Sequence, residues 1–422
     1  MGEGGRSAGR SGGRSRWLAR QRQGGTPGQP ATGAPAPGQA DPEQADPGQA
    51  GSGRRRGNRS RTPRWARVCT MLGALLVLVS GAGLVGFEAV LARYEGAVQE
   101  ADLFGDDAAG AVPEKKSDIK GPLNILLVGI DPRTPEWSPL ADSIMVLHVN
   151  ETLDSAYLFS LPRDLLVRIP AFDKADYNGG TEKLNAAMAH GSKVPGAKLP
   201  SPAQGFELLS KTVTQVTGIQ RFDAGAIINF NGFQKIVDAM GGVDMYIDTN
   251  VKSEHRQPNG KTRTLKPGGG GYTGPQAEYK KGNAHLKGWQ ALDYVRQRYG
   301  LPNGDYDRQR HQQQFVRAMA DQALSKDVVT NPIKLDSVLR AAGESLIFNG
   351  RGHDLVDFAF ALRGLRSDSI QMIKLPGGGV TQGGSYKGEK FQPIAEEFFA
   401  ALKAGTLDSF VINNPELLNK AR

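Results

Sequence analysis

The hydrophobic positions of the chain fall into runs of strand length separated by longer amphipathic stretches. Residues 123–130, LNILLVGI, form a continuous apolar run, as expected for a strand that is buried on both faces. Two further runs, at 143–149 and 155–161, follow at short spacing and predict neighbouring strands. Shorter runs predict additional strands at 225–230, 243–248 and 370–375.

Between these runs, stretches with helical patterning predict α-helices. Pro202 after Ser201 is a typical helix start and opens the stretch 202–218. Strands that alternate with helices indicate an α/β fold, in three α-β-α layers around one mixed central sheet. Residues 252–285 are rich in glycine, lysine and asparagine and have no sustained period, so we expect an exposed excursion there. The other predicted helices are 181–191, 231–242, 305–324, 333–347, 353–365 and 390–403.

The first 120 residues have a different pattern. Residues 1–67 are of low complexity and predict a disordered tail, because such a segment buries too little apolar surface to offset its ordering entropy. Uncharged residues then run from 68 to 87, long enough to cross a bilayer core of about 30 Å. The predicted organisation is therefore a tail at 1–67, a transmembrane anchor at 68–91, a polar stalk at 92–120, a folded domain at 121–405 and a C-terminal tail at 406–422.

Charge sets the orientation of this anchor and excludes one class of partner. The net charge is +9, and residues 1–67 account for all of it with 13 arginines, no lysine and four acidic residues. An arginine-rich flank stays in the cytoplasm, so the folded domain is expected outside the cell membrane. That domain carries no excess of positive charge, which makes nucleic acid a poor partner. The single cysteine, Cys69, lies in the predicted anchor, so thiol catalysis in the domain is excluded.

One stretch of the chain concentrates guanidinium groups. Arg296 and Arg298 alternate, so in an extended segment both side chains leave the same face. Arg308 and Gln312 are four residues apart, which places them on one face at the start of a predicted helix, where the helix dipole favours an anion. Asp305 is expected to cap that helix. Arginines outnumber carboxylates here, and guanidinium forks match phosphate oxygens, so we predict one shared anionic ligand.

Carboxylates are expected at the same place. Asp131 follows the first predicted strand and Asp142 precedes the second, so the two meet if these strands are antiparallel neighbours. Two carboxylates without a histidine suit a hard cation such as Mg²⁺, which also takes phosphate oxygens. For each aspartate alone, an ordinary turn residue is the alternative interpretation. Arg163 and Asp164 close the third strand at the same edge.

No P-loop, nucleophile elbow or histidine spacing typical of zinc sites occurs in the sequence. The chemistry is therefore expected to depend on arginine, aspartate and metal.

Six ordered motifs resemble the LytR-CpsA-Psr family. They are NILLVGID at 124–131, ADSIMVLHV at 141–149, SLPRD at 160–164, KLNAAMAHG at 183–191, FNGFQKIVDAMGGVDM at 230–245, and HLKGWQALDYVRQR with DYDRQRHQQQF at 285–315. The resemblance spans roughly residues 120–325. It implies an enzyme of the outer face of a Gram-positive type wall, which transfers a glycopolymer from a polyprenyl diphosphate to peptidoglycan as a phosphodiester. The implied partners are this lipid-linked glycopolymer, peptidoglycan and the membrane, and the implied cofactor is Mg²⁺.

The resemblance also assigns roles to single positions. The residues that match the family's diphosphate-binding set are Arg163, Arg296, Arg298, Arg308 and Gln312. The Mg²⁺-associated pair is Asp131 and Asp142, and the residues expected to act in catalysis are Arg163, Asp142 and Arg298.

Two positions depart from the family pattern, because Leu140 and His311 stand where the family usually has an arginine. Arg133 and Arg310 are the candidates to replace those two cations.

The mechanism expected from this resemblance is attack by the acceptor hydroxyl on the phosphorus that bears the glycan, with polyprenyl phosphate leaving. Asp131 and Asp142 are the candidates for the general base. Leu208 and Val216 are candidates to line an apolar groove for the lipid tail. Two alternatives stay open: a polyprenyl-diphosphate pyrophosphatase, which uses water as the nucleophile, and a non-catalytic membrane-anchored envelope regulator.

Overall fold

The computed structural model describes residues 98–105, 118–132, 134–323, 325 and 331–419. The predicted tail at 1–67 and the predicted anchor at 68–91 lie outside these ranges. Within these ranges, none of the helices is both long enough and apolar enough to span a bilayer.

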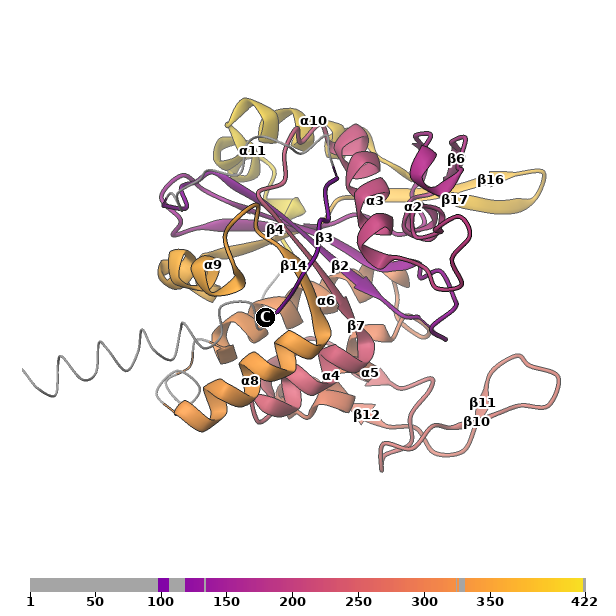
Figure 1. The fold of residues 1–422 in the computed structure, drawn as a ribbon. Helices are drawn as coiled ribbons and strands as arrows, with labels where there is room; N and C mark the ends of the chain where they lie inside the picture. The colour runs from indigo at the N-terminus through magenta and orange to yellow at the C-terminus, as the bar shows by residue number, and fades with distance from the viewer. Residues whose placement is uncertain (1–97, 106–117, 133, 324, 326–330, 420–422) are drawn as a thin grey trace, which may run out of the picture. The chain divides into compact units, whose positions relative to one another are not determined.

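A seven-stranded mixed sheet forms the centre of the domain (Figure 1). β2 pairs antiparallel with β3 and parallel with β7, and β15 runs parallel to β4. The α/β fold with a mixed central sheet is therefore confirmed. In spatial order the strands are β1 (Gln99–Glu100), β14 (Leu346–Asn349), β7 (Ala224–Asn229), β2 (Leu123–Ile130), β3 (Ala141–Val149), β4 (Ala156–Ser160) and β15 (Ile370–Ile373).

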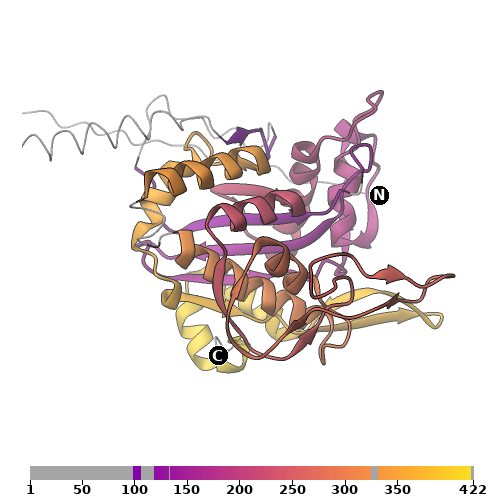
Figure 2. The ribbon, with the colours of Figure 1, turned by 90° about the horizontal axis from the view of Figure 1, so that it is seen from below.

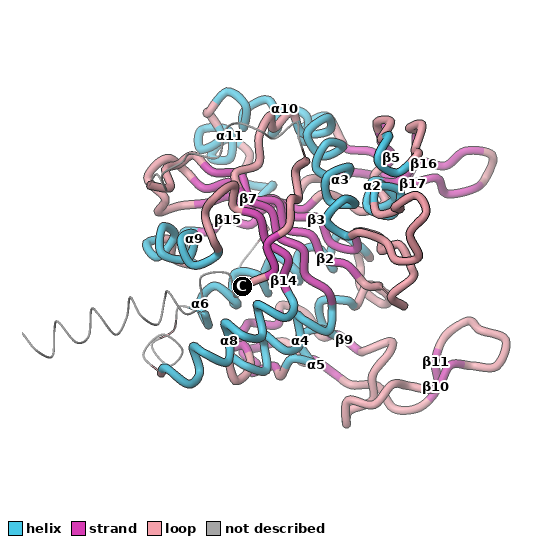
Figure 3. Tube along the Cα trace, in the orientation of Figure 1, coloured by secondary structure: helices cyan, strands magenta, loops and turns pink. Residues whose placement is uncertain are grey.

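Helices cover both faces of this sheet, which is the middle of three layers (Figure 3). The long apolar strands make this possible because successive side chains point to opposite faces. Val128 and Val146 pack in one hydrophobic core, whereas Ile125 and Met145 pack in another. The first face carries α2 (Leu184–Gly191), α3 (Pro202–Thr217), α10 (Pro393–Ala404) and α11 (Leu407–Asn413). The second carries α4 (Phe230–Ala239), α5 (Gly288–Arg296), α6 (Asp305–Ala323), α8 (Pro332–Ser345) and α9 (Leu355–Ala361).

Outside the central sheet, the described residues also form two-stranded ladders. They are β5 (Leu166–Ile169) with β6 (Gly180–Lys183), β8 (Val243–Ile247) with β13 (Gly282–Leu286), β9 (Val251–Lys252) with β12 (Glu278–Tyr279), β10 (Thr264–Leu265) with β11 (Tyr272–Thr273), and β16 (Gly377–Gln382) with β17 (Ser385–Phe391). In Figures 1 and 2 the β10–β11 and β16–β17 ladders extend on the same side of the domain.

The domain is longer at both ends than the sequence predicted. In the predicted stalk, β1 joins the edge of the sheet, and Leu103 and Phe104 are buried. In the predicted C-terminal tail, α11 buries Leu407 and Val411 against α10. Both apolar groups are short, and even the helical spacing of Leu407, Phe410 and Val411 covers only about one turn, so their burial depends on the surfaces they meet.

Three of the predicted helices also need correction. The helix expected at 181–191 begins only at Leu184, because residues 180–183 form β6. The helix expected at 333–347 ends at Ser345, and the chain then enters β14. The helix expected at 390–403 begins only at Pro393, because residues up to Phe391 pair with β16. In all three cases strand pairing overrides the local helical pattern: β6 pairs with β5, β14 with the distant β7, and β17 with β16 in a hairpin.

Candidate active site

The β2–β3 pair brings two predicted site residues to one end of the sheet. The strands are antiparallel and Ile130 pairs with Ala141. Asp131 directly follows β2, and Asp142 is the second residue of β3 rather than the residue before it, so both lie at the same strand end. Both aspartates line one cavity of about 700 Å³. The two strands are thus the antiparallel neighbours that the prediction required.

The same cavity gathers every residue that the sequence assigned to the site. Arg163 comes from the loop after β4, Arg296 is the last residue of α5, and Arg298 lies in the following loop. Arg308 and Gln312 come from the first turns of α6. All five residues line the cavity together with the two aspartates.

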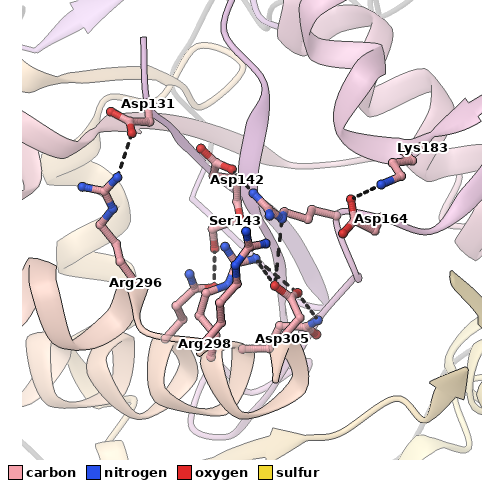
Figure 4. Close-up of polar contacts among 12 residues, drawn as sticks. Asp131, Asp142, Ser143, Asp164, Lys183, Arg296, Arg298 and Asp305 are labelled. Carbon is pink, nitrogen blue, oxygen red and sulfur yellow. Dashed lines mark hydrogen bonds and ion pairs between the residues drawn. The ribbon is translucent and has the colours of Figure 1, made fainter. Parts of the chain in front are cut away.

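Each aspartate is held by an arginine (Figure 4). Arg296 Nη2 donates to Asp131 Oδ2 at 3.0 Å, and Arg163 Nη1 donates to Asp142 Oδ1. Arg308 Nη2 donates to the backbone oxygen of Asp142 at 3.1 Å. These contacts fix the directions of three guanidinium groups around one space.

Asp305 joins two of these arginines, although the sequence predicted only a helix cap. It is the first residue of α6, and its Oδ1 lies 3.0 Å from Arg308 Nη2 and 3.9 Å from Arg163 Nε. The spacing of three residues between Asp305 and Arg308 was a signal for this pair. Asp305 therefore positions the arginines of the site.

Burial and charge act in opposite directions on these guanidinium groups. Burial lowers the pKa of Arg163, but the carboxylates of Asp142 and Asp305 outweigh it, so the pKa lies above its ordinary value. The Arg308 side chain is only 7% exposed, and burial lowers its pKa although Asp305 opposes the shift. A buried cation of this kind favours an additional anion nearby.

Two buried donors of the site have no hydrogen-bond partner. Within the described ranges, Arg163 Nε and Arg308 Nε are buried and make no hydrogen bond. A buried donor without a partner costs about 1–3 kcal/mol. An anionic ligand with several oxygens, such as a phosphate, would satisfy both.

The convergence of Arg296 and Arg298 arises differently from the prediction. They do not lie on an extended strand, because Arg296 ends a helix whose C-cap is Gln297. The Arg296 guanidinium lies over the Phe230 ring at 4.3 Å, and Arg298 lies over Tyr299 at 4.8 Å. Aromatic faces, rather than a strand, hold the two arginines in place.

Gln312 is bonded into the strand end. Ser143 Oγ donates to Gln312 Oε1 at 3.0 Å, and Gln312 Nε2 donates to the Val295 backbone oxygen at 3.3 Å. One polar contact thus connects α6 with β3 at the cavity floor.

At Leu140 and His311, where the family usually has an arginine, the described residues place no substitute cation in the site cavity. His311 is fully buried and stacks on Tyr294 with ring centroids 4.5 Å apart. Arg310 does not replace the missing arginine, because it forms ion pairs with Asp248 and Asp307 and does not line the site cavity. Arg133, the candidate to compensate for Leu140, lies outside the described residues.

Sequence reasoning missed part of the cavity wall. The predicted excursion at 252–285 contributes Glu254, His255 and Tyr272, and α4 contributes Phe230. No periodic pattern marks the residues of the excursion, so the sequence contained no signal for their position.

A second, apolar cavity of about 210 Å³ lies between the sheet and helices α4, α5 and α6. Phe230 and Gln312 line both this cavity and the arginine-lined one, so the two adjoin. Leu208 and Val216, the predicted groove residues, do not line it. Both lie on α3, in the core on the opposite face of the sheet. The remaining lining includes Leu127, Met145, Ala226, Ile228, Phe233, Leu292, Val295, Phe315, Val316, Met319 and Leu346.

Comparison with known proteins assigns the chain to one family. A sequence model described as the LytR_cpsA_psr family matches residues 93–404. Biofilm regulatory protein A of Streptococcus mutans is 29% identical over 67% of this chain and 64% of its own length. Cell wall biosynthesis protein LcpA of Corynebacterium glutamicum is 28% identical over 77% of this chain and 62% of its own length. The chain thus spans less than two thirds of the length of these two relatives.

A third relative matches over most of its length. Polyisoprenyl-teichoic acid–peptidoglycan teichoic acid transferase TagU of Bacillus cereus is 26% identical over 73% of this chain and 87% of its own length. Two crystal structures share the fold. TagV of B. subtilis is 22% identical with a TM-score of 0.50, over 69% of this chain and 98% of its own. Protein gbs0355 of Streptococcus agalactiae is 23% identical with a TM-score of 0.51, over 68% of this chain and 87% of its own.

Proposed function

Because the chain belongs to the LytR-CpsA-Psr family, we propose that it transfers a cell-wall glycopolymer from a polyprenyl diphosphate to a sugar hydroxyl of peptidoglycan. The bond formed is a phosphodiester, and polyprenyl phosphate leaves. One observation carries the proposal: an arginine-lined polar cavity adjoins an apolar cavity. A lipid diphosphate has an anionic head that suits the arginine-lined cavity and an apolar tail that suits the other.

The arginines supply most of what phosphoryl transfer requires of a protein. Charge grows on the equatorial and leaving oxygens of the reacting phosphate, and fixed guanidinium groups stabilise it there. Arg163, Arg298 and Arg308 are proposed for this role, and Arg296 and Gln312 are proposed to bind the rest of the diphosphate. The unpartnered Nε atoms of Arg163 and Arg308 are the donors that the phosphate oxygens would satisfy.

We propose Mg²⁺ as the cofactor of this reaction, held by Asp131 and Asp142. Across the described ranges, no group of three or more His, Cys, Asp or Glu side chains is placed to hold a metal. Two carboxylates fit Mg²⁺ nevertheless, because this ion usually takes one or two carboxylates together with water and substrate phosphates. When bound, Mg²⁺ supplies neutralisation of phosphate charge.

A transfer assay with full-length protein tests the function. The protein is incubated with a glycopolymer on polyprenyl diphosphate and with peptidoglycan, and the products are analysed for a glycan–peptidoglycan phosphodiester and for polyprenyl phosphate. Both are expected together. Release of lipid phosphate without the new bond would indicate the diphosphatase instead. Neither product would indicate a regulator that only binds.

The apolar cavity makes a separate prediction. Ala226→Phe is expected to fill much of the cavity and to lower transfer from a long polyprenyl donor about tenfold, since two displaced methylene groups are worth about 1.6 kcal/mol. Transfer from a donor with a very short isoprenoid chain should not change, which serves as the internal control. Transfer rates with the two donors, measured side by side, give the result. Equal losses with both donors would contradict a lipid tail in this cavity.

We propose that the protein is anchored by residues 68–91, with its N-terminus in the cytoplasm and its domain outside. A reporter that is active only outside the cytoplasm should be active when fused after Arg422 and inactive when fused before Arg54. Reporter activity in intact cells measures this. The reverse pattern would overturn both the anchor and the wall location.

A further inference from the structure

An arm between β9 and β12 forms one wall of the active-site cavity. The arm consists of residues 253–277 and carries the β10–β11 ladder (Figure 2). Glu254, His255 and Tyr272 of the arm line the cavity together with Arg296. The arm therefore borders the same space as the phosphate-binding residues.

The base of the arm is bonded to the helix that carries Arg296. Ser253 is fully buried, and its Oγ donates to Asp293 Oδ1 at 3.0 Å. The backbone nitrogen of Glu254 donates to Gln297 Oε1 at 2.8 Å. Asp293 lies within α5 and Gln297 is its C-cap, so the start of the arm is set relative to Arg296.

A buried arginine then holds the two sides of the arm together. Arg263 is 8% exposed, and its guanidinium donates to the backbone oxygens of Glu254 at 2.7 Å, Tyr272 at 3.2 Å and Gly274 at 3.2 Å. Hydrogen bonds from a charged donor are stronger than those between neutral groups. They keep His255 and Tyr272 as neighbours, whose rings meet edge to face with centroids 5.1 Å apart.

The imidazole of His255 is available for proton transfer. Within the described part of the chain, neither ring nitrogen has a hydrogen-bond partner. Arg296 and Asp293 face it from α5, and Glu254 and Arg256 flank it in the arm. Burial lowers the pKa of His255 below its ordinary value of 6.5, Arg296 and Arg256 act in the same direction, and Asp293 and Glu254 oppose them. The ring is therefore neutral at pH 7 and able to accept a proton.

The carboxylates of Asp131 and Asp142 are engaged by other groups. Asp131 accepts from Arg296 and Asp142 accepts from Arg163, and both are proposed to hold Mg²⁺. Their oxygens are thus committed to these contacts, whereas the imidazole of His255 is not.

We propose that His255 is the general base that takes the proton from the acceptor hydroxyl. This inference rests on the proposed transfer function. The acceptor oxygen forms a bond to the phosphorus that bears the glycan. The bond from that phosphorus to the bridging oxygen breaks, and the electron pair leaves with polyprenyl phosphate. The acceptor proton moves to the His255 ring and then to solvent.

The test compares His255→Gln with wild type in the full-length protein. General-base catalysis contributes about 10²- to 10⁴-fold, so transfer at neutral pH should fall by that factor. Binding of a short-chain isoprenoid diphosphate, measured by titration calorimetry, should not change, which excludes misfolding as the cause. Below the pKa of His255, wild-type kcat/KM should fall about tenfold per pH unit, and His255→Gln should lack this acidic limb.

A matched histidine provides the control. His285→Gln should keep both the rate and the acidic limb, because His285 is exposed on β13 and does not line the cavity. The inference is overturned if His255→Gln transfers at the wild-type rate with the limb intact, or if Glu254→Gln removes the limb in its place. Wild-type protein that forms no glycan–peptidoglycan bond at any pH would instead overturn the proposed function itself.

Discussion

Arg308→Lys is expected to lower transfer about 10- to 100-fold, because each charge-assisted contact is worth about 1.5–3 kcal/mol and 1.4 kcal/mol is a tenfold effect. Lysine keeps the charge but has a single nitrogen. Arg308 contacts the Asp142 backbone oxygen and Asp305 through Nη2, which leaves its other nitrogens for the phosphate. The single nitrogen of lysine cannot make both kinds of contact. The same loss is expected for the lysine variants of Arg296 and Arg298. Transfer rates at subsaturating lipid diphosphate measure it.

Arg317→Lys is the matched control for these variants. Arg317 lies on the same helix, nine residues after Arg308 and therefore on the opposite side. It lines a separate cavity with Asp244 and Asp321. Its lysine variant should be near wild type. If all four lysine variants behaved alike, the arginines would form only a generic positive surface, and the regulator alternative would return.

Asp142→Asn and Asp131→Asn are expected to lower Mg²⁺-dependent transfer about 100-fold, since a bound metal supplies several kcal/mol of charge stabilisation. Their effect on folding should be small, below about 1 kcal/mol, because ion pairs of partly exposed groups contribute little. The side chains of Asp142 and Asp131 are 21% and 32% exposed. A Mg²⁺ titration of the transfer rate, with denaturant unfolding in parallel, separates the two effects.

The control for the aspartates is Asp164→Asn. Asp164 also lies just after a strand and pairs with Lys183 at 3.1 Å, but it does not line the cavity (Figure 4). Its variant should keep the wild-type dependence on Mg²⁺. Full transfer by both Asp131→Asn and Asp142→Asn in the presence of a chelator would end the metal proposal.

Part of this site followed from local sequence patterns. The sequence places Asp131 after one apolar run and Asp142 before the next. For the two aspartates to meet, these strands, which are close in the chain, needed only to be neighbours. The spacing of four between Arg308 and Gln312 placed both on one face of a helix, and the structure has them in one cavity. Such features depend on residues close in the chain, where backbone geometry sets which side chains share a face.

The rest of the site was decided by contacts between distant residues. Arg296 meets Asp131 across 165 positions, at a helix end that replaced the expected strand. The arm became a cavity wall because Ser253 is bonded to Asp293, 40 residues away. The sequence by itself determined the long apolar strands of the central sheet, the helix that carries Arg308 and the presence of the guanidinium groups. Only the tertiary structure decided which aromatic faces, carboxylates and arm residues surround them, because those contacts join surfaces that no local period relates.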